Sequence, residues 1–365
     1  MNPPVMRSPR SVDISITSQC NLRCKYCYFF GNPSVHYSDI PTQEWLEFFD
    51  ELVSLAVMDV CFAGGEPFLR PDLRELINGI VGNRMRFRII SNGGLITDDS
   101  AAFLAATGRC DGVQISLDSA IPEEHDACRG KGSWEGAVRG IRILKRNSVN
   151  VNVRMTIHRH NYLNIERTAA FILEDLGLPE FGTNVAGYIG KCRLHADEIL
   201  LTLNERQYIM EKLLELAVQY KGLINAAAGP LAEGRMWRKM ETARLEGAPA
   251  FANGGRLTAC GCTASRLAVD ADGSIIPCAQ LAHIKMGSIN KDSLSEIWLS
   301  HPEMVAMRNR SKIPLDSFEF CADCDYIPYC TGNCPALAYQ LVGTVLHPSP
   351  EACLRRYLQQ GGHLV

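Results

Sequence analysis

Apolar and polar residues follow a regular succession of short strands and amphipathic helices over the first 220 residues. Residues 12–17 (VDISIT) alternate apolar and polar side chains with a period of two, which is typical of a β-strand. Five more strands are predicted at 59–64, 86–91, 112–117, 149–157 and 180–186. Helical spacing of apolar residues is found at 41–56, 71–80, 98–107, 133–146, 161–176 and 202–220. Six strands alternating with helices predict parallel βαβ units, an α/β fold and a partial (β/α)6 barrel.

Short polar side chains mark where several of these helices begin. Thr42 and Ser133 stand at the start of their helices, and we expect both to act as N-caps. Thr202 and Glu205 have the spacing of a capping box.

The remaining chain changes character twice and suggests three regions. Residues 1–220 form the predicted core, and the Gly/Pro-rich segment 221–259 is expected to be a bridging linker with a short helix. Residues 260–365 are rich in cysteine and form the second domain. Within that domain, local patterns predict a β-hairpin at 266–278 that turns at Asp270–Gly273, and a helix at 294–309.

Four unusual motifs follow the first four predicted strands. CNLRCKYC (20–27), GGEP (64–67), SNGG (91–94) and SLDS (116–119) come after strands one to four in turn. Parallel sheets of this kind bind their ligands at the carboxyl ends of the strands. We therefore expect the four motifs to meet on one rim of the barrel.

Composition narrows the class of protein. The net charge of −3 does not favour nucleic acid or an anionic membrane as a partner. The first residues contain no apolar segment of a secretory signal, and no apolar run is long enough to span a bilayer, so a cytoplasmic protein is expected. Fifteen cysteines are an odd number and lie in clusters. Clustered thiols without an export signal favour metal binding over disulfides.

Cys20, Cys24 and Cys27 provide three thiolates in one loop. A structural zinc site needs four ligands, whereas three thiolates on a 4Fe–4S cluster leave one iron open. The spacing resembles the CxxxCxφC signature of the radical S-adenosylmethionine (SAM) superfamily, with Tyr26 at the aromatic position. The resemblance implies that SAM occupies the open iron and that its reductive cleavage yields a 5′-deoxyadenosyl radical, which abstracts hydrogen.

The motifs on the next strands are similar to the SAM contacts of that superfamily. Gly64 and Gly65 would allow close approach of the backbone, and Glu66 would accept from the SAM ammonium group. A tight turn with an exposed glutamate is the alternative interpretation of GGEP. Ser91 and Asn92 are similar to the third-strand motif, which is suited to ribose or carboxylate.

Two further positions complete the cofactor site that the resemblance implies. Ser116 and Asp118 occupy the matching place after strand four. Arg154, on strand five, would pair either with the SAM carboxylate or with a neighbouring acidic residue.

The second cysteine group resembles the SPASM domain, which holds two auxiliary 4Fe–4S clusters. Every fixed spacing of that pattern is met, from Cys262 through Gly273 and Cys278 to the run that begins at Cys321. The resemblance assigns the outer cluster to Cys321, Cys324, Cys330 and Cys353. It assigns the inner cluster to Cys262, Cys278 and Cys334, with Cys260 as an uncertain fourth ligand. Three 4Fe–4S clusters are therefore implied, one that binds SAM and two auxiliary ones.

Enzymes with this domain mostly modify peptides and proteins. The resemblance implies oxidative crosslinking of a ribosomally made precursor peptide, with a separate leader-binding protein or direct leader capture, and an electron donor such as flavodoxin or ferredoxin. A sulfatase maturase is the nearest rival, but Ala279 and Gln280 stand where that class has an aspartate base after the cysteine. A non-catalytic iron–sulfur or zinc scaffold remains a third alternative, because CADCDYIPYCTGNC (321–334) also suits a zinc ribbon.

Other possible site residues have ordinary structural interpretations. Cys61, Cys110, Cys128 and Cys192 are expected to be free thiols, with Cys192 near the barrel rim. The histidines show no ligand spacing. RGKGSW (129–134) resembles a loop of peptide-modifying enzymes, but a glycine-rich loop before a helix cap is the favoured interpretation.

Overall fold

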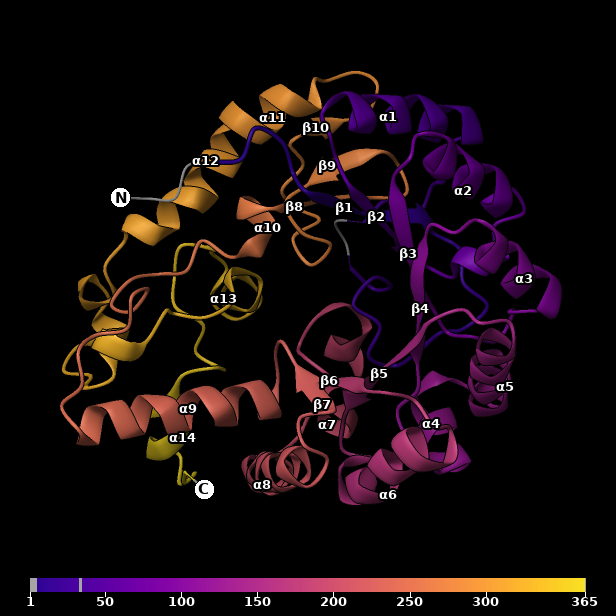
Figure 1. Ribbon diagram of the computed structural model, residues 1–365. Helices are drawn as coiled ribbons and strands as arrows, with labels where there is room; N and C mark the ends of the chain where they lie inside the picture. Colours follow the sequence, from indigo (N-terminus) through magenta and orange to yellow (C-terminus); the bar gives the residue numbers. More distant parts are fainter. Residues whose placement is uncertain (1–4, 33–34, 365) are drawn as a thin grey trace.

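The computed structural model describes residues 5–32 and 35–364, which form a curved α/β structure around one continuous sheet (Figure 1). Its strands have the order β10-β9-β8-β1-β2-β3-β4-β5-β6-β7. Strands β8 and β1 to β7 pair in parallel, and β9 and β10 are antiparallel additions at one edge. The predicted α/β class with a parallel sheet is confirmed. The strands are β1 (Ser11–Thr17), β2 (Asp59–Gly64), β3 (Arg86–Ser91), β4 (Cys110–Ser116), β5 (Val151–Ile157), β6 (Phe181–Val185), β7 (Ile224–Ala226), β8 (Arg266–Val269), β9 (Ser274–Ile276) and β10 (Gly287–Ser288).

Helices α1, α2, α3, α5, α6 and α8 follow the outer, convex side of the sheet (Figure 1). The core region contains α1 (Thr42–Ser54), α2 (Leu73–Gly82), α3 (Asp98–Ala106), α4 (Pro122–Arg129), α5 (Ser133–Arg146), α6 (Ile165–Ala170), α7 (Ala196–Ile199) and α8 (Leu203–Gln219). The rest of the chain adds α9 (Pro230–Leu245), α10 (Gly261–Ala264), α11 (Leu294–Ser300), α12 (Pro302–Asn309), α13 (Pro335–Val342) and α14 (Leu354–Gln359).

The two faces of the sheet differ in chemistry because successive side chains of a strand point to opposite faces. On β1, Val12, Ile14 and Ile16 are fully buried in the core with the aromatic side chains of α1. Alternate positions point to the opposite, concave face, which carries polar residues along the whole sheet. This polar set comprises Asp13, Arg88, Gln114, Ser116, Asn152, Arg154, Asn184 and Asn225.

Two predicted helices are interrupted. The segment 161–176 divides into a 3₁₀ turn (Tyr162–Asn164), α6 and a π-helical turn (Phe171–Asp175). The segment 294–309 breaks at His301, which has an extended ψ of 131°. Pro302 accounts for this break, because the residue before a proline is disfavoured in helical geometry.

The predicted N-caps are correct in one of three cases. Thr202 and Glu205 form the expected capping box at the start of α8, with hydrogen bonds of 3.3 and 2.7 Å. The prediction is wrong for Thr42, which lies inside α1 and donates to Asp72. It is also wrong for Ser133, whose hydroxyl donates to Asp126 over 3.0 Å.

The segment 221–259 contains more structure than the predicted linker. Strand β7 pairs with β6 in parallel and so extends the core sheet to a seventh strand. The 16-residue helix α9 packs against α8. At the other edge, β8 pairs with β1, so the predicted hairpin of the second domain continues the same sheet. No helix in the described part of the chain is long and apolar enough to cross a membrane.

Candidate active site and cluster-binding cysteines

The three-cysteine loop is held against the ends of β1 and β2. The Gly65 amide donates to the Thr17 carbonyl and the Glu66 amide donates to the Gln19 carbonyl, both over 2.8 Å. The Ser18 amide donates to Asp39 over 2.6 Å at the start of the loop. These contacts position the backbone on which the three cysteines lie.

The thiols of the loop lie close enough to interact electrostatically. Burial, with a smaller contribution from Cys27 and Cys20, raises the pKa of Cys24 to about 11. Burial also raises the pKa of Cys20, and the Cys27 thiol adds to this effect. Thiols that destabilise one another's charge in this way suit a cation or an iron–sulfur cluster, which requires them as thiolates.

The two glycines of GGEP are required by the protein backbone itself. A Cβ on Gly65 would lie 1.9 Å from the Gln19 carbonyl oxygen, and one on Gly64 would lie 2.4 Å from that of Thr17. Gly64 also has a φ of +115°, which L side chains rarely adopt. The close approach therefore occurs between this turn and the cysteine loop, and the predicted contact of the glycines with SAM stays a prediction.

Glu66 is a buried carboxylate, with 1% of its surface exposed. It accepts from the Ser91 hydroxyl and the Asn92 amide, both over 2.8 Å, and from the Phe68 amide. It forms no ion pair with any described residue. Burial accordingly raises its pKa. The alternative interpretation of GGEP as a turn with an exposed glutamate is wrong.

Asn92 brings the third strand up to the cysteine loop. Its side-chain amide donates to Asn21 over 2.8 Å and lies 4.0 Å from the Cys20 sulfur. Ser91, by contrast, is buried between Glu66 and the Gly93 amide. The structure therefore brings the SNGG and GGEP motifs to the same rim as the three cysteines.

Arg154 lies on the concave face of β5, beside Ser116 of β4 and Gly182 of β6. Its guanidinium donates to the Thr183 carbonyl over 3.4 Å and forms no ion pair with a described acidic residue. Burial therefore lowers its pKa. A Cβ at Gly182 would lie 2.9 Å from Arg154 Nη1, so the glycine leaves room for this side chain. Of the two predicted partners, the neighbouring acidic residue is not found in the described part of the chain.

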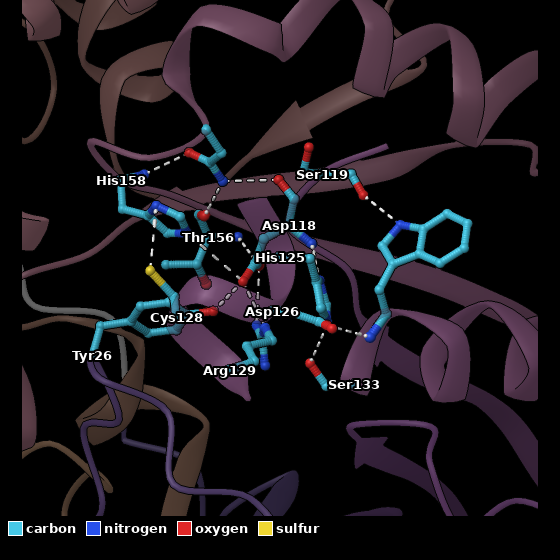
Figure 2. Close-up of polar contacts among 12 residues, drawn as sticks. Tyr26, Asp118, Ser119, His125, Asp126, Cys128, Arg129, Ser133, Thr156 and His158 are labelled. Atoms are coloured by element: carbon cyan, nitrogen blue, oxygen red, sulfur yellow. Dashed lines mark hydrogen bonds and ion pairs between the residues drawn. The ribbon is translucent and has the colours of Figure 1, made fainter. Parts of the chain in front are cut away.

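Hydrogen-bond donors surround the side chain of Asp118 (Figure 2). Its side chain is fully buried and accepts from Arg129 at 2.6 and 3.0 Å, from the Thr156 amide at 2.9 Å and from the Tyr26 hydroxyl. Arg129 overcomes the effect of burial and holds the pKa of Asp118 well below its usual range. These contacts occupy both carboxylate oxygens, so the structure gives Asp118 a part in holding the motif together.

The Asp118 network includes residues that sequence reasoning did not identify. Arg129 stacks 5.3 Å from the Tyr26 ring centre, and the Cys128 carbonyl accepts from the Lys25 amide over 2.8 Å. The end of α4 therefore braces the loop between Cys24 and Cys27. The RGKGSW motif was the signal for Arg129, which is its first residue.

Two histidines complete this network. His125 Nδ1 accepts from the Asp118 amide over 3.2 Å, and His158 lies 3.8 Å from the Cys128 sulfur (Figure 2). Burial lowers the pKa of each histidine to about 4. Burial also raises the pKa of the Cys128 thiol to about 12. A raised thiol pKa and lowered histidine pKa values disfavour the thiolate–imidazolium pair that a nucleophilic triad needs.

Eight cysteines of the second domain form two groups of four. The outer group consists of Cys321, Cys324, Cys330 and Cys353, which line one cavity. Burial, followed by the other three thiols, raises the pKa of Cys321 to about 12. The cavity lined by four thiols fits a 4Fe–4S cluster.

The inner group consists of Cys260, Cys262, Cys278 and Cys334. The thiols of Cys278 and Cys334 help to raise the pKa of Cys262. The thiol of Cys260 helps to raise the pKa values of Cys278 and Cys334. A hydrogen bond with Cys262 holds the pKa of Cys260 below its usual range. The structure thus places Cys260 with the other three thiols, although a role for it as a ligand stays a prediction.

Two further predictions concern the cysteines outside the three groups and the zinc-ribbon alternative. Cys61, Cys128 and Cys192 are buried free thiols, whereas Cys110 is half-buried. No three His, Cys, Asp or Glu side chains in the described ranges are grouped as for a single metal ion, and the zinc-ribbon alternative stays untested.

Three comparisons place the chain among known proteins. The radical SAM superfamily matches residues 14–172, and the SPASM iron–sulfur cluster-binding domain matches residues 260–325. Fe-coproporphyrin III synthase of Methanosarcina barkeri is 28% identical over 94% of this chain and 87% of its own length. PqqA peptide cyclase of Ruegeria pomeroyi is 24% identical over 92% of this chain and 85% of its own length.

The fold is shared with SuiB of Streptococcus suis, whose structure is known with its precursor peptide SuiA bound. The two structures superpose with a TM-score of 0.71 at 14% identity, over 96% of this chain and 77% of SuiB. The family matches cover the three-cysteine loop, the GGEP rim and the start of the second cysteine group. The chain is therefore a radical SAM enzyme that carries an SPASM iron–sulfur cluster-binding domain.

Proposed function

We propose that this enzyme oxidatively crosslinks a ribosomally made precursor peptide. The observation that carries the proposal is the grouping of eight thiols into two sets of four beside the radical SAM core. Forming a crosslink from two hydrogen-bearing positions removes two hydrogens. Abstraction accounts for one, and the other leaves as a proton and an electron. Two auxiliary clusters would give that electron a route out of the site.

In this proposal, the cysteines hold the clusters and other residues form the SAM site. Cys20, Cys24 and Cys27 hold a 4Fe–4S cluster, and the two groups of four hold two more, with Cys260 as the fourth inner ligand. Together, the first cluster and SAM supply a 5′-deoxyadenosyl radical. Asn92 and Ser116 would contact the cofactor from the rim and the concave face. Tyr26, Gly64, Gly65, Ser91 and Asp118 would hold the surrounding loops in position through their contacts with other residues.

Glu66 and Arg154 match the two charges of an amino acid. The buried carboxylate of Glu66 lacks a cation among the described residues, and the guanidinium of Arg154 lacks an anion. Both lie at the concave face or rim of the same barrel. An ammonium at Glu66 and a carboxylate at Arg154 would compensate both charges, as the methionine part of SAM requires.

A peptide substrate is supported by the relatives and by the concave face. PqqA peptide cyclase is named for a peptide, and SuiB binds its precursor peptide. The face is lined by amide, hydroxyl and guanidinium groups, which suit peptide backbone. A leader-binding protein and a flavodoxin or ferredoxin are the further partners of this proposal, with residues 1–220 as the radical SAM core and 260–365 as the SPASM domain.

A porphyrin is the second candidate substrate. It is favoured by the Fe-coproporphyrin III synthase, whose identity of 28% exceeds the 24% of the peptide cyclase. A porphyrin with several carboxylates would need several cations. On the concave face, however, Arg88 lies 3.8 Å from Asp13, which leaves Arg154 as the arginine without an acidic partner there.

The experiment uses anaerobically reconstituted full-length protein with SAM and a reductant. The short peptides encoded near the gene are added, and mass spectrometry follows a loss of two hydrogens. Deuterium from the labelled peptide should appear in 5′-deoxyadenosine. Conversion of iron coproporphyrin III instead would establish the second candidate, and formylglycine on a sulfatase peptide would establish a maturase of that class. No SAM cleavage at full iron content would leave the scaffold alternative.

A further inference from the structure

Arg310 is a fully buried arginine in the second domain. It begins the 3₁₀ turn Arg310–Lys312 that follows α12, and none of its surface is exposed. Nη1 donates to the Thr258 carbonyl over 2.8 Å, and Nη2 donates to the His347 carbonyl over 3.4 Å. Nε has no hydrogen-bond partner. Its only partners among the described residues are therefore neutral carbonyl groups.

The charge of this side chain has no carboxylate to balance it. Arg310 forms no ion pair in the described part of the chain. The ionisable groups that act on it are the thiols of Cys334, Cys260 and Cys262, three members of the inner group. An isolated buried charge is costly, and the native structure keeps one only where something compensates it.

The backbone contacts of Arg310 reach both cysteine groups. Thr258 lies two residues before Cys260, and its hydroxyl accepts from the Cys260 amide over 3.1 Å. Thr258 is also hydrogen bonded to Thr331, which follows Cys330 directly. The guanidinium is thus held in one position by segments that also carry cysteines of the two groups.

We infer that Arg310 is the counter-charge of the inner auxiliary cluster and raises its reduction potential. Four thiolates give a bound 4Fe–4S cluster a net negative charge, and reduction by one electron makes that charge more negative. A fixed cation beside the thiolates stabilises the reduced form more than the oxidised form. The inference rests on the proposed function only in that the inner thiols bind a cluster.

Arg308 provides a matched control two residues away. It donates to the Thr263 carbonyl over 2.9 Å and stacks on Trp298 at 4.6 Å. Burial lowers its pKa without a contribution from any cysteine. An Arg308→Gln change therefore removes a neighbouring arginine that does not act on the cluster thiols.

The test compares R310Q, R310K and R308Q as full-length reconstituted proteins. Redox titration followed by electron paramagnetic resonance measures the midpoint potential of each cluster without substrate or turnover. In R310Q, the equilibrium constant for reduction of one auxiliary cluster should fall about tenfold, which is about 59 mV for one electron. R310K and R308Q should keep the parent potential.

Each outcome decides the inference. Unchanged potentials in R310Q at full iron content would overturn it. If R310Q loses inner-cluster iron, retention of iron at the parent potential in R310K still supports a charge effect, whereas equal loss in both variants shows a packing role and overturns it. Because the measurement needs no substrate, failure of the peptide assay alone would count against the proposed function only.

Discussion

Two buried arginines lie beside the cysteines of this enzyme, and their surroundings are opposite. Arg129, beside the three-cysteine loop, makes two hydrogen bonds with the fully buried carboxylate of Asp118. Arg310, in the second domain, donates to two carbonyl groups and has no carboxylate partner among the described residues, and the thiols that influence its pKa belong to the inner cysteine group. The first charge is balanced by the protein itself. The second depends on what the thiols bind.

The difference indicates how each region is organised. The Asp118–Arg129 pair is complete without a cofactor and holds the loop through Tyr26, while the neighbouring Cys128 carbonyl accepts from the Lys25 amide. Glu66, Arg154 and Arg310 have no oppositely charged partner among the described residues, and we propose that bound cofactors balance their charges. The buried Asp118–Arg129 ion pair therefore stabilises the fold around the cysteine loop. Buried charges without an opposite charge nearby are the positions where we expect cofactors to bind.

The largest expected effect is the loss of SAM cleavage when the three-cysteine loop, and not the second domain, is altered. Changing Cys20, Cys24 and Cys27 to Ala should remove one cluster and abolish SAM cleavage, because no thiolate remains to hold the iron that binds SAM. Iron analysis and chromatography of 5′-deoxyadenosine measure both quantities.

Cys324→Ala, in the outer group, is the control for that change. It should keep SAM cleavage and lose the modified peptide, because the substrate electron has no exit. SAM cleavage by the triple variant would contradict the assignment of the first site. Normal product formation by Cys324→Ala would contradict the role of the outer group.

A stability comparison tests the balance of charge directly. In cluster-free protein, Arg129→Met should lower the free energy of unfolding by about 3–5 kcal/mol, because it leaves the buried Asp118 carboxylate uncompensated. Arg310→Met should leave that free energy unchanged or raise it, because the charge it removes has no partner in the absence of a cluster. Denaturant titration measures both variants, and equal losses would show that the two arginines do not differ in this way.

Acid should weaken the three-cysteine region through its histidines. Both His125 and His158 have a pKa lowered by burial to about 4, against an unfolded value of 6.5. The unfolded chain therefore binds more protons between these values, and stability is lost as pH falls from 6.5 to 4. The loss amounts to roughly 3 kcal/mol for each histidine.

Denaturant titrations at several pH values measure that loss. The variant His158→Gln should lose less stability over this range than the parent protein. The exposed His36 provides the control His36→Gln, which should behave like the parent. An identical pH dependence of all three proteins would contradict the burial argument.

The smallest expected effect is on SAM affinity, when the buried carboxylate of Glu66 is replaced. Glu66→Gln should weaken SAM binding by about 1–3 kcal/mol, the scale for loss of a charge-assisted hydrogen bond, and should leave the iron content unchanged. Calorimetry of the reconstituted protein measures the affinity. The exposed Glu75 in α2 offers the control Glu75→Gln, and equal affinities of the two variants would place the SAM ammonium elsewhere.

Local patterns predicted the elements of the core well because alternation and helical spacing depend on near neighbours. The bounds of β2 and β3 agree with the predicted segments 59–64 and 86–91. The same reasoning failed at Thr42 and Ser133, because their hydroxyl groups donate to carboxylates outside their own helices, Asp72 and Asp126. Strand β7 was missed because three residues carry too little periodicity.

The sequence by itself determined the radical SAM and SPASM resemblance, through cysteine spacings that do not depend on packing. Only the tertiary structure decided which charges are balanced. Glu66 is buried because the turn after β2 packs under the cysteine loop, and Asp118 is occupied because the end of α4 returns to it. Arg310 was not identified from the sequence at all, because its significance lies in the absence of an acidic neighbour. Whether an acidic residue lies near Arg310 depends on how distant segments pack around it, and local sequence patterns do not predict this.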